Sequence, residues 1–261
     1  MKALCGCALA ALILGATLFV QPAPGQKQSG SIDVSRARLL WDEMIAAKGG
    51  REKLNQVSDL VVRMRTDCPN DEAMVLKYFF WKRVSTETLW VFPDRFYFVT
   101  LGVAEDPGDA NFNLYNGDAR KFWSFFPGMK TPREFSSEAS LKFAKNRVLR
   151  AQIMYLGETR WVKPAPVGYS RQRIHLRAVD VVHTRLDDIS ADFYLDRQTH
   201  LPLKVATNLS FGGQVLHSSQ GYVLSDYTSI SGIRFPLKMA AGLCRAQLGY
   251  DVNASLRSEF F

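Results

Sequence analysis

The chain has 261 residues, of which 47% are hydrophobic and 12% aromatic, and its formal net charge at pH 7 is +8. This length fits one large β-rich domain or two small ones. The positive excess is moderate and scattered, and the sequence has no helix-turn-helix, zinc-finger or aromatic RNA-binding motif. Nucleic acid is therefore excluded as the expected partner.

The first 25 residues have the pattern of a secretory signal peptide. Lys2 gives a basic start, residues 3–20 are uncharged and largely apolar, and the small residues Ala23 and Gly25 mark a cleavage site. Removing residues 1–25 takes away one Lys and no acidic residue, so the net charge falls from +8 to +7. A retained membrane anchor is the alternative. Cleavage of the signal peptide predicts a periplasmic or secreted protein.

A short tether and an amphipathic helix are expected next. Residues 26–34 are mostly polar residues and Gly, which suits a tether. From Ser35 onward, apolar residues recur at the i, i+3, i+4, i+7 and i+8 spacing of a helix with one apolar face. Asp33 or Ser35 can cap the start of this helix, and Gly49-Gly50 can end it. A short turn of helix is expected at residues 51–55.

Residues 35–261 are expected to form a single domain, mainly β with helices. Short β-prone runs separated by Pro, Gly, Asn and Asp form an early and a late series. The early runs are residues 60–66, 74–81, 96–101, 112–115 and 122–126, and the late runs are residues 174–182, 189–195, 203–211, 215–224 and 233–240. Residues 136–155, between the two series, have near-helical spacing of apolar residues. This pattern predicts a curved or nearly closed antiparallel sheet.

The early strands carry apolar side chains on both faces. In residues 96–101 both alternating sets are mostly apolar, and residues 78–126 hold 15 of the 31 aromatic residues of the chain. In residues 189–195, by contrast, apolar and polar residues alternate, as expected of a sheet with one wet face. Two coverings for the second apolar face are open. Either the amphipathic helices bury it outright, or they leave a cavity for an apolar ligand.

Two cysteines remain after the signal peptide is removed. Cys5 and Cys7 leave with it, and Cys68 and Cys244 stay in an oxidising compartment. A disulfide between Cys68 and Cys244 would close a long loop and stabilise the fold by a few kcal/mol. The alternative is a pair of small buried thiols. No Cys-x-x-Cys motif is present, so a redox site is not expected.

No residue pattern predicts catalysis, a metal site or a cofactor. The four histidines, all in the late strand series, are His175, His183, His200 and His217. His175 and His183 are expected on one strand face with no third metal ligand nearby. Nucleophile-elbow, phosphate-loop and calcium-loop motifs are missing from the sequence. We therefore expect a protein that is not an enzyme and has no cofactor. An enzyme of another type would need His175, His183 and an acidic residue to meet in a cleft.

Several stretches, taken in order, resemble one protein family. These are "LWVFPDRFYF", "LYNGDARKFWSFFP", "FYLDRQTHLPLKV" and "YVLSDYTSISGIRFPLKM". They resemble the LolA-like family of periplasmic carriers, which includes the outer-membrane lipoprotein carrier protein, its receptor LolB and the sensory domain of RseB. The residues that match family patterns are Trp90, Pro93 and Phe96, and, more loosely, Asn116, Gly117, Trp123 and Pro127. The resemblance implies a half-barrel sheet with a helical lid over a hydrophobic cavity for lipid acyl chains.

The resemblance implies a carrier of an acyl chain, lipid or lipoprotein, in outer-membrane lipoprotein sorting or lipid transport. Its partners would be a membrane-bound donor or acceptor protein. The alternative is an interaction module or envelope-stress sensor that binds a protein. The residues expected to line the lipid cavity are Trp81, Trp90, Phe92, Phe96, Phe98, Trp123 and Phe125, with Trp41 and Met44 on the lid.

Overall fold

The structure is a computed structural model of the chain. It describes residues 33–67, 83–102, 111–125, 130–211, 214–217 and 221–255. These residues belong to one compact unit that spans Ile32–Phe261. The expected signal peptide, the expected strand at residues 74–81, Trp81 and Cys68 lie outside the described residues. No helix within the described residues is long and apolar enough to cross a membrane.

The helices of the described residues are α1 (Val34–Lys48), α2 (Arg51–Asn55) and α3 (Glu138–Leu156). The Asp33 side chain caps α1 by accepting a hydrogen bond from the Arg36 backbone N–H at 2.9 Å. Ser137 caps α3 in the same way. α1 ends where Gly49 adopts a φ of 128°, a conformation that residues with side chains rarely adopt. All three expected helices are confirmed.

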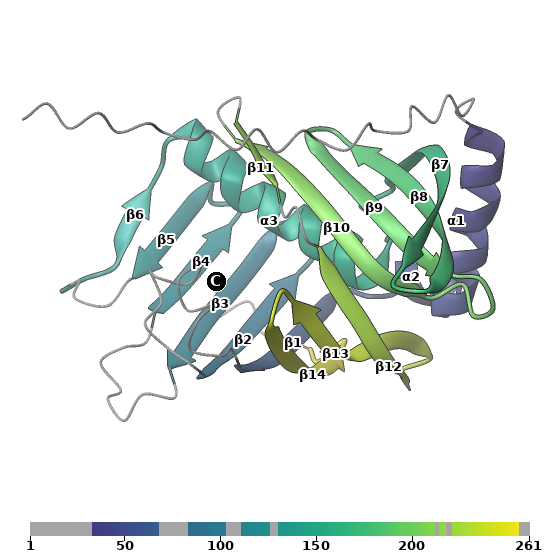
Figure 1. Cartoon of the computed structure of the whole chain (residues 1–261). Helices are drawn as coiled ribbons and strands as arrows, with labels where there is room; N and C mark the ends of the chain where they lie inside the picture. The colour runs from purple at the N-terminus through teal and green to yellow at the C-terminus, as the bar shows by residue number, and fades with distance from the viewer. Residues whose placement is uncertain are drawn as a thin grey trace, which may run out of the picture. The chain divides into compact units, whose positions relative to one another are not determined.

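The strands of the described residues form one antiparallel sheet of 14 strands. They are β1 (Asp59–Asp67), β2 (Arg83–Val91), β3 (Arg95–Gly102), β4 (Asn111–Asn116), β5 (Lys121–Phe125), β6 (Arg133–Phe135), β7 (Ala165–Ile174), β8 (Arg177–Leu186), β9 (Ile189–Asp196), β10 (Pro202–Phe211), β11 (Gln214–His217), β12 (Tyr222–Ile230), β13 (Ile233–Ala241) and β14 (Cys244–Val252). Their order across the sheet is β6-β5-β4-β3-β2-β1-β14-β13-β12-β10-β9-β8-β7, and β11 pairs with β10 (Figure 1).

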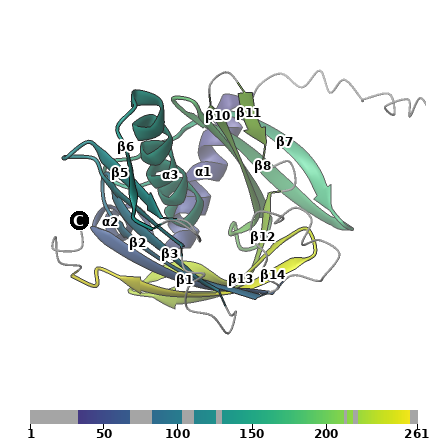
Figure 2. The same cartoon turned by 90° about the vertical axis from the view of Figure 1, so that its left-hand side faces the viewer.

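The sheet is open and strongly curved. β6 and β7 are its two edges and do not pair with each other. Figure 2 shows the sheet bent into two arms, with β12, β13 and β14 at the bend and α3 between the arms. The expected fold class, a curved antiparallel half-barrel with helices, is confirmed.

The strand register assigns each early side chain to one of two faces. One row across β1 to β5 consists of Leu60, Trp90, Phe96, Tyr115 and Phe122, and the next row consists of Val61, Leu89, Tyr97, Leu114 and Trp123. The first row belongs to the buried core together with Ala144 and Val148 of α3, so we call this the inner face. The second row points to the opposite, outer face because side chains alternate along a strand.

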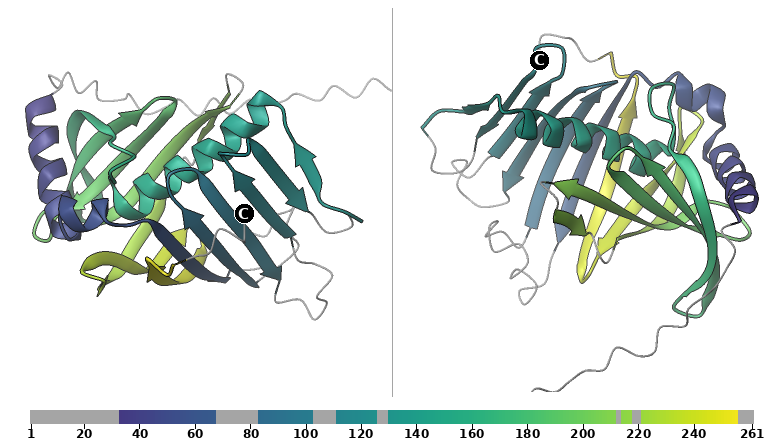
Figure 3. Two further views of the ribbon diagram at one scale, coloured as in Figure 1. Left: turned by 180° about the vertical axis from the view of Figure 1, so that it is seen from behind. Right: turned by 90° about the horizontal axis from the view of Figure 1, so that it is seen from above.

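Helix α3, and not α1, covers the inner face of the early strands. Figure 3 shows α3 running across β2 to β5, with α1 at the other end of the sheet. There α1 packs against β7, β8 and β13. The Trp41 ring of α1 meets the Phe193 ring of β9 edge-on, with 5.1 Å between ring centroids. Trp41 and Met44, which were expected on the lid, therefore lie on a helix that packs against the late strands.

The hairpin between β7 and β8 shows that two predictions are wrong, one on a strand boundary and one on the placement of two histidines. Residues 174–182 are not one strand, because β7 ends at Ile174 and β8 begins at Arg177. His175 lies in the turn between them, with a φ of 54°. His175 and His183 therefore do not share a strand face. No Gly, Pro or Asn marks this turn in the sequence, which is why the hairpin was missed.

The pairing of the cysteines stays a prediction. Cys244, the first residue of β14, is disulfide-bonded. β1 and β14 run antiparallel with Asp67 opposite Arg245. Cys68 lies outside the described residues and is kept as the predicted partner.

Candidate functional site

Two cavities stand out in the described part of the chain. The first has a volume of about 330 Å³ and lies between α1, α2 and the segment that follows α3. The second has a volume of about 270 Å³ and lies between α3 and the inner face of the sheet. We call them the α1 cavity and the α3 cavity.

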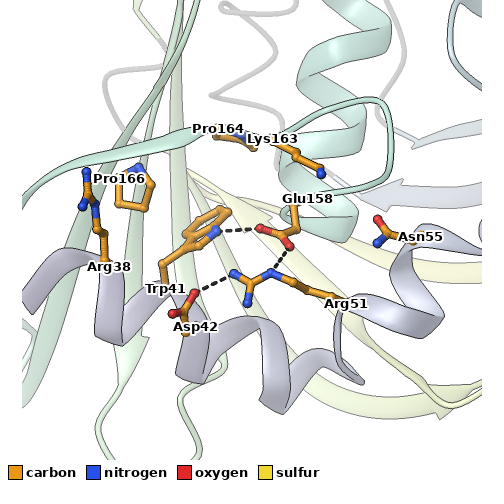
Figure 4. A pocket seen from close by; sticks show the side chains of 9 residues that line it. All are labelled: Arg38, Trp41, Asp42, Arg51, Asn55, Glu158, Lys163, Pro164 and Pro166. Atoms are coloured by element: carbon orange, nitrogen blue, oxygen red, sulfur yellow. Dashed lines mark hydrogen bonds and ion pairs between the residues drawn. The ribbon is translucent and has the colours of Figure 1, made fainter. Parts of the chain in front are cut away.

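The polar groups of the α1 cavity satisfy one another (Figure 4). The buried Glu158 carboxylate accepts hydrogen bonds from Trp41 Nε1 at 2.9 Å and from Arg51 Nε at 2.6 Å. Arg51 also donates to Asp42 at 2.5 Å. The hydrogen bonds to Asp42 and Glu158 raise the pKa of Arg51 above its ordinary value, so the ion pairs persist over a wide pH range. This network holds α1 and α2 against the chain after α3 and leaves little for a ligand to bind.

The α3 cavity is lined largely by apolar side chains, which come from α3 and from the inner face of the sheet. Its apolar lining includes Val62, Met64, Trp90, Phe98, Met154 and Met239. Methionine side chains are unbranched and flexible, so they adapt to an apolar guest of irregular shape. Tyr155 and Tyr222 also line the cavity and carry hydroxyl groups. The lining is therefore suited to a flexible hydrocarbon chain.

The structure places the predicted cavity residues in several different settings. Trp90 and Phe98 line the α3 cavity. Phe96 is fully buried beneath it, and Phe92 is buried beside Trp161, with 6.0 Å between ring centroids.

The two lid residues lie at the other end of the sheet. Trp41 lines the α1 cavity. Met44 is fully buried and packs close to Gly157. Neither residue belongs to the lining of the α3 cavity.

Trp123 and Phe125 are corrected, because they point to the outer face. Along β5 the residues that face inward are Phe122 and Ser124. Phe122 packs against the rings of Phe96 and Phe135 at centroid distances of 6.4 and 5.7 Å. A run with large rings at adjacent positions does not reveal which set faces the core, since a shift of one residue exchanges the faces.

Two arginines of α3 in the cavity lining were missed. Arg147 and Arg150 contribute to the lining together with Ala151 and Met154. The buried stripe of α3 includes Ala144, so Arg147 stands where the helical period calls for an apolar residue. A charged residue inside an apolar stripe was the signal that could have revealed this site.

Neither arginine has a carboxylate partner among the described residues. Arg147 lies over the Phe96 and Phe98 rings, 5.0 and 5.3 Å from their centroids. Arg150 donates from Nη2 to Thr207 Oγ1 at 2.9 Å. Burial, together with the charge of Arg150, lowers the pKa of Arg147 to about 10. The Arg147 side chain therefore remains cationic at neutral pH.

Two buried N–H donors at the α3 cavity have no acceptor. They are Arg150 Nε and Trp90 Nε1. An unsatisfied buried donor costs about 1–3 kcal/mol. The α3 cavity thus combines apolar walls with positive charge and unused hydrogen-bond donors.

A Ser-His-Asp series lies on the outer face of β7, β8 and β9. Ser170 Oγ lies 3.0 Å from His183 Nε2, and His183 Nδ1 lies 2.7 Å from Asp192 Oδ1. Serine hydrolases use this connectivity. Here Ser170 lies within a regular strand, and the three residues line neither the α1 cavity nor the α3 cavity. We interpret the series as hydrogen bonding across neighbouring strands.

Ser170 is expected not to react with a fluorophosphonate probe, because activation of the serine also requires a bound substrate and an oxyanion site. Intact-mass spectrometry after incubation with the probe checks this expectation, with trypsin as a positive control. A stoichiometric adduct on Ser170 that disappears in His183→Ala would show that the series is catalytic.

No metal site emerges from the part of the chain that the structure describes. Within it, no group of three or more His, Cys, Asp or Glu side chains could hold a metal ion.

Comparison with known proteins gives structural matches only. No protein-family model matches the sequence, and no curated protein matches it. A LolA superfamily protein from Nitrosomonas europaea is similar over 86% of this chain and 96% of its own, with a TM-score of 0.49 and 14% identity. A DUF1329 family protein from Desulfovibrio piger is similar over the same shares, with a TM-score of 0.47 and 12% identity.

A third match is the MucA/MucB complex of Pseudomonas aeruginosa. It covers 86% of this chain and 60% of that one, with a TM-score of 0.28 and 13% identity. The first of the three structures belongs to the family that the sequence motifs resemble. With TM-scores below 0.5, these superpositions are too loose to carry a function over to this chain.

Proposed function

We propose that the protein is a non-enzymatic carrier that holds an acyl chain in the α3 cavity. The observation that carries the proposal is the cavity between α3 and the inner face, with Met64, Met154 and Met239 among its lining residues. Burial of one methylene group contributes about 0.8 kcal/mol, so part of one chain supplies several kcal/mol before the costs of binding. The signal-peptide pattern supports work in the periplasm or outside the cell.

The volume of the cavity limits the size of the ligand. Small-molecule sites usually have volumes of about 300–1,000 Å³. The α3 cavity, at about 270 Å³, lies just below this range. It therefore suits part of one acyl chain, and a lipid or lipoprotein with several chains would require α3 to move. Release to a membrane-bound acceptor protein would use the same movement.

The protein purified from a lipid-containing host is expected to carry an acyl ligand. Native mass spectrometry should show it at up to one per chain, and organic extraction should identify it. Ala151→Phe places a ring in the cavity and is expected to reduce bound ligand at least tenfold. Lys145→Phe, at an exposed position of the same helix, is the matched control and should keep the ligand.

Thermal unfolding of both variants must first show that they fold. A wild-type protein that is free of lipid and takes up neither palmitate nor 1-palmitoylglycerol would contradict the proposal. The alternative, an interaction module or stress sensor for a protein partner, would then be favoured. In that case the surface to test for partner binding is β6, an exposed edge strand to which a peptide can pair.

A further inference from the structure

We infer that the ligand of the α3 cavity is an anionic amphiphile, with an acyl chain along the apolar lining and a carboxylate or phosphate head group on Arg147 and Arg150. The inference rests on the proposed function and adds the chemical class of the head group.

The two arginines are placed to act on one anion. They are three residues apart on α3, so their side chains leave the same face of the helix. Both line the cavity. A guanidinium presents its N–H donors in a planar fork that fits two oxygens of a carboxylate or phosphate.

Nothing described around the cavity neutralises this charge. The lining includes no Asp or Glu, and neither arginine forms an ion pair with a carboxylate of the described residues. Several other cations of the protein differ in this respect, since Arg51 pairs with Glu158, Lys142 with Asp188 and Arg177 with Asp196. Both arginines are half-buried. Two like charges held partly away from water without a counter-ion are costly, and a bound anion lowers that cost.

The contacts that the arginines do make leave donors unused. The Phe96 and Phe98 rings attract the Arg147 charge but accept no conventional hydrogen bond. Thr207 takes only one donor of Arg150, and Arg150 Nε remains without an acceptor. Trp90 Nε1, which is also unsatisfied, supplies a further neutral donor at the same cavity.

Lipids that share one chain but differ in head group test the inference. Palmitate carries a carboxylate, 1-palmitoyl lysophosphatidic acid a phosphate, and 1-palmitoylglycerol no charge. Delipidated full-length protein is titrated with each, below the critical micelle concentration and at low salt. At least one anionic lipid is expected to bind about tenfold or more tightly than the neutral one. The relative affinities of palmitate and the phosphate lipid show which head group the site prefers.

Variants then attribute the preference to the two side chains. Arg147→Met and Arg150→Met are each expected to abolish the preference for the anionic lipid while changing the affinity for 1-palmitoylglycerol less than threefold. Lys145→Met removes an exposed charge from the same helix and should keep the preference. If a methionine variant does not fold, Arg147→Lys replaces it and should lower the preference, because an ammonium lacks the planar fork.

The outcomes separate this inference from the proposed function. Equal binding of charged and neutral lipids, unchanged in the arginine variants, would contradict the inference of an anionic head group. The proposal of an acyl-chain carrier would still stand. If none of the three lipids binds, both proposals fail. If inorganic phosphate or acetate binds with an affinity similar to that of the anionic lipids, the site is a simple anion site. That result would also contradict the inference of an amphiphilic ligand.

Discussion

Replacing Lys48 with methionine is expected to stabilise the protein at pH 7 by about 3 kcal/mol. Lys48 belongs to α1 and is only 2% exposed. Its Nζ donates to the backbone carbonyl of Arg234 at 3.3 Å and lies 6.0 Å from the centroid of the Phe235 ring. Burial lowers the pKa of Lys48 to about 7. Methionine fills a similar volume without a charge, at the loss of one hydrogen bond.

The effect of Lys48 on stability should depend on pH in one direction. Below pH 7 both the folded and the unfolded chain hold the proton, so the cost of burying the charge is fully present. Between about pH 7 and 10.5 the unfolded chain binds a proton that the folded protein lacks, so the free energy of unfolding rises with pH. The stabilisation by Lys48→Met should therefore shrink over this window.

Urea denaturation of both proteins at pH 7 and pH 9.5 measures the difference. Lys53→Met, at an exposed position of α2, is the control and should change stability by less than about 0.5 kcal/mol at either pH. A Lys48→Met variant that is less stable than wild type at pH 7, or a difference that grows with pH, would contradict the buried charge.

Removing the Glu158 side chain is expected to destabilise the protein by about 3 kcal/mol. Glu158→Ala leaves Trp41 Nε1 buried without an acceptor and removes the buried partner of Arg51. Glu158→Gln keeps one acceptor oxygen but turns an amide donor toward Trp41 or Arg51, so about half of the loss is expected.

Asp42→Ala is the matched control for Glu158. Asp42 pairs with the same arginine but is exposed, and such pairs contribute less than about 1 kcal/mol. Urea denaturation of the three variants gives the comparison. If Glu158→Ala and Asp42→Ala cost the same, the network in the α1 cavity does not hold α1 in place.

The architecture is largely predictable from the sequence, because the spacing of apolar residues distinguishes helices from strands. The start of α1 follows from Asp33 and the apolar spacing that comes after it, and β9 follows from the alternation that begins at Ile189. β7 was missed because Pro164 and Pro166 look like loop residues. An edge strand tolerates proline, since one side of it needs no donor, and β7 is an edge.

The candidate site was only partly predictable because it forms between elements that are distant in sequence. The inner row through Trp90 and Phe96 depends on the register of five strands, and one residue of slip would present Tyr97 and Trp123 instead. Which helix covers that row is a matter of tertiary packing, and spacing alone does not distinguish α1 from α3. Arg147 was visible in the sequence, but its meaning depends on the rings beneath it.

Burial is uneven along α3. The first five residues, from Glu138 to Lys142, are exposed or half-exposed, whereas Gln152 and Thr159 at the other end are fully buried and hydrogen-bonded to each other at 2.9 Å. Gly157 ends the helix with a φ of 85°, against Met44 and Ile45 of α1.

If α3 moves to admit a chain, we expect the Glu138 end to lift and the end near Gly157 to stay in place, because only the latter is fully buried. The fixed end of the helix then lies beside the Glu158 network. A chain would enter from the side of β5 and β6. The Trp41–Glu158 hydrogen bond would then affect how easily α3 moves, and not the affinity of the cavity for lipid.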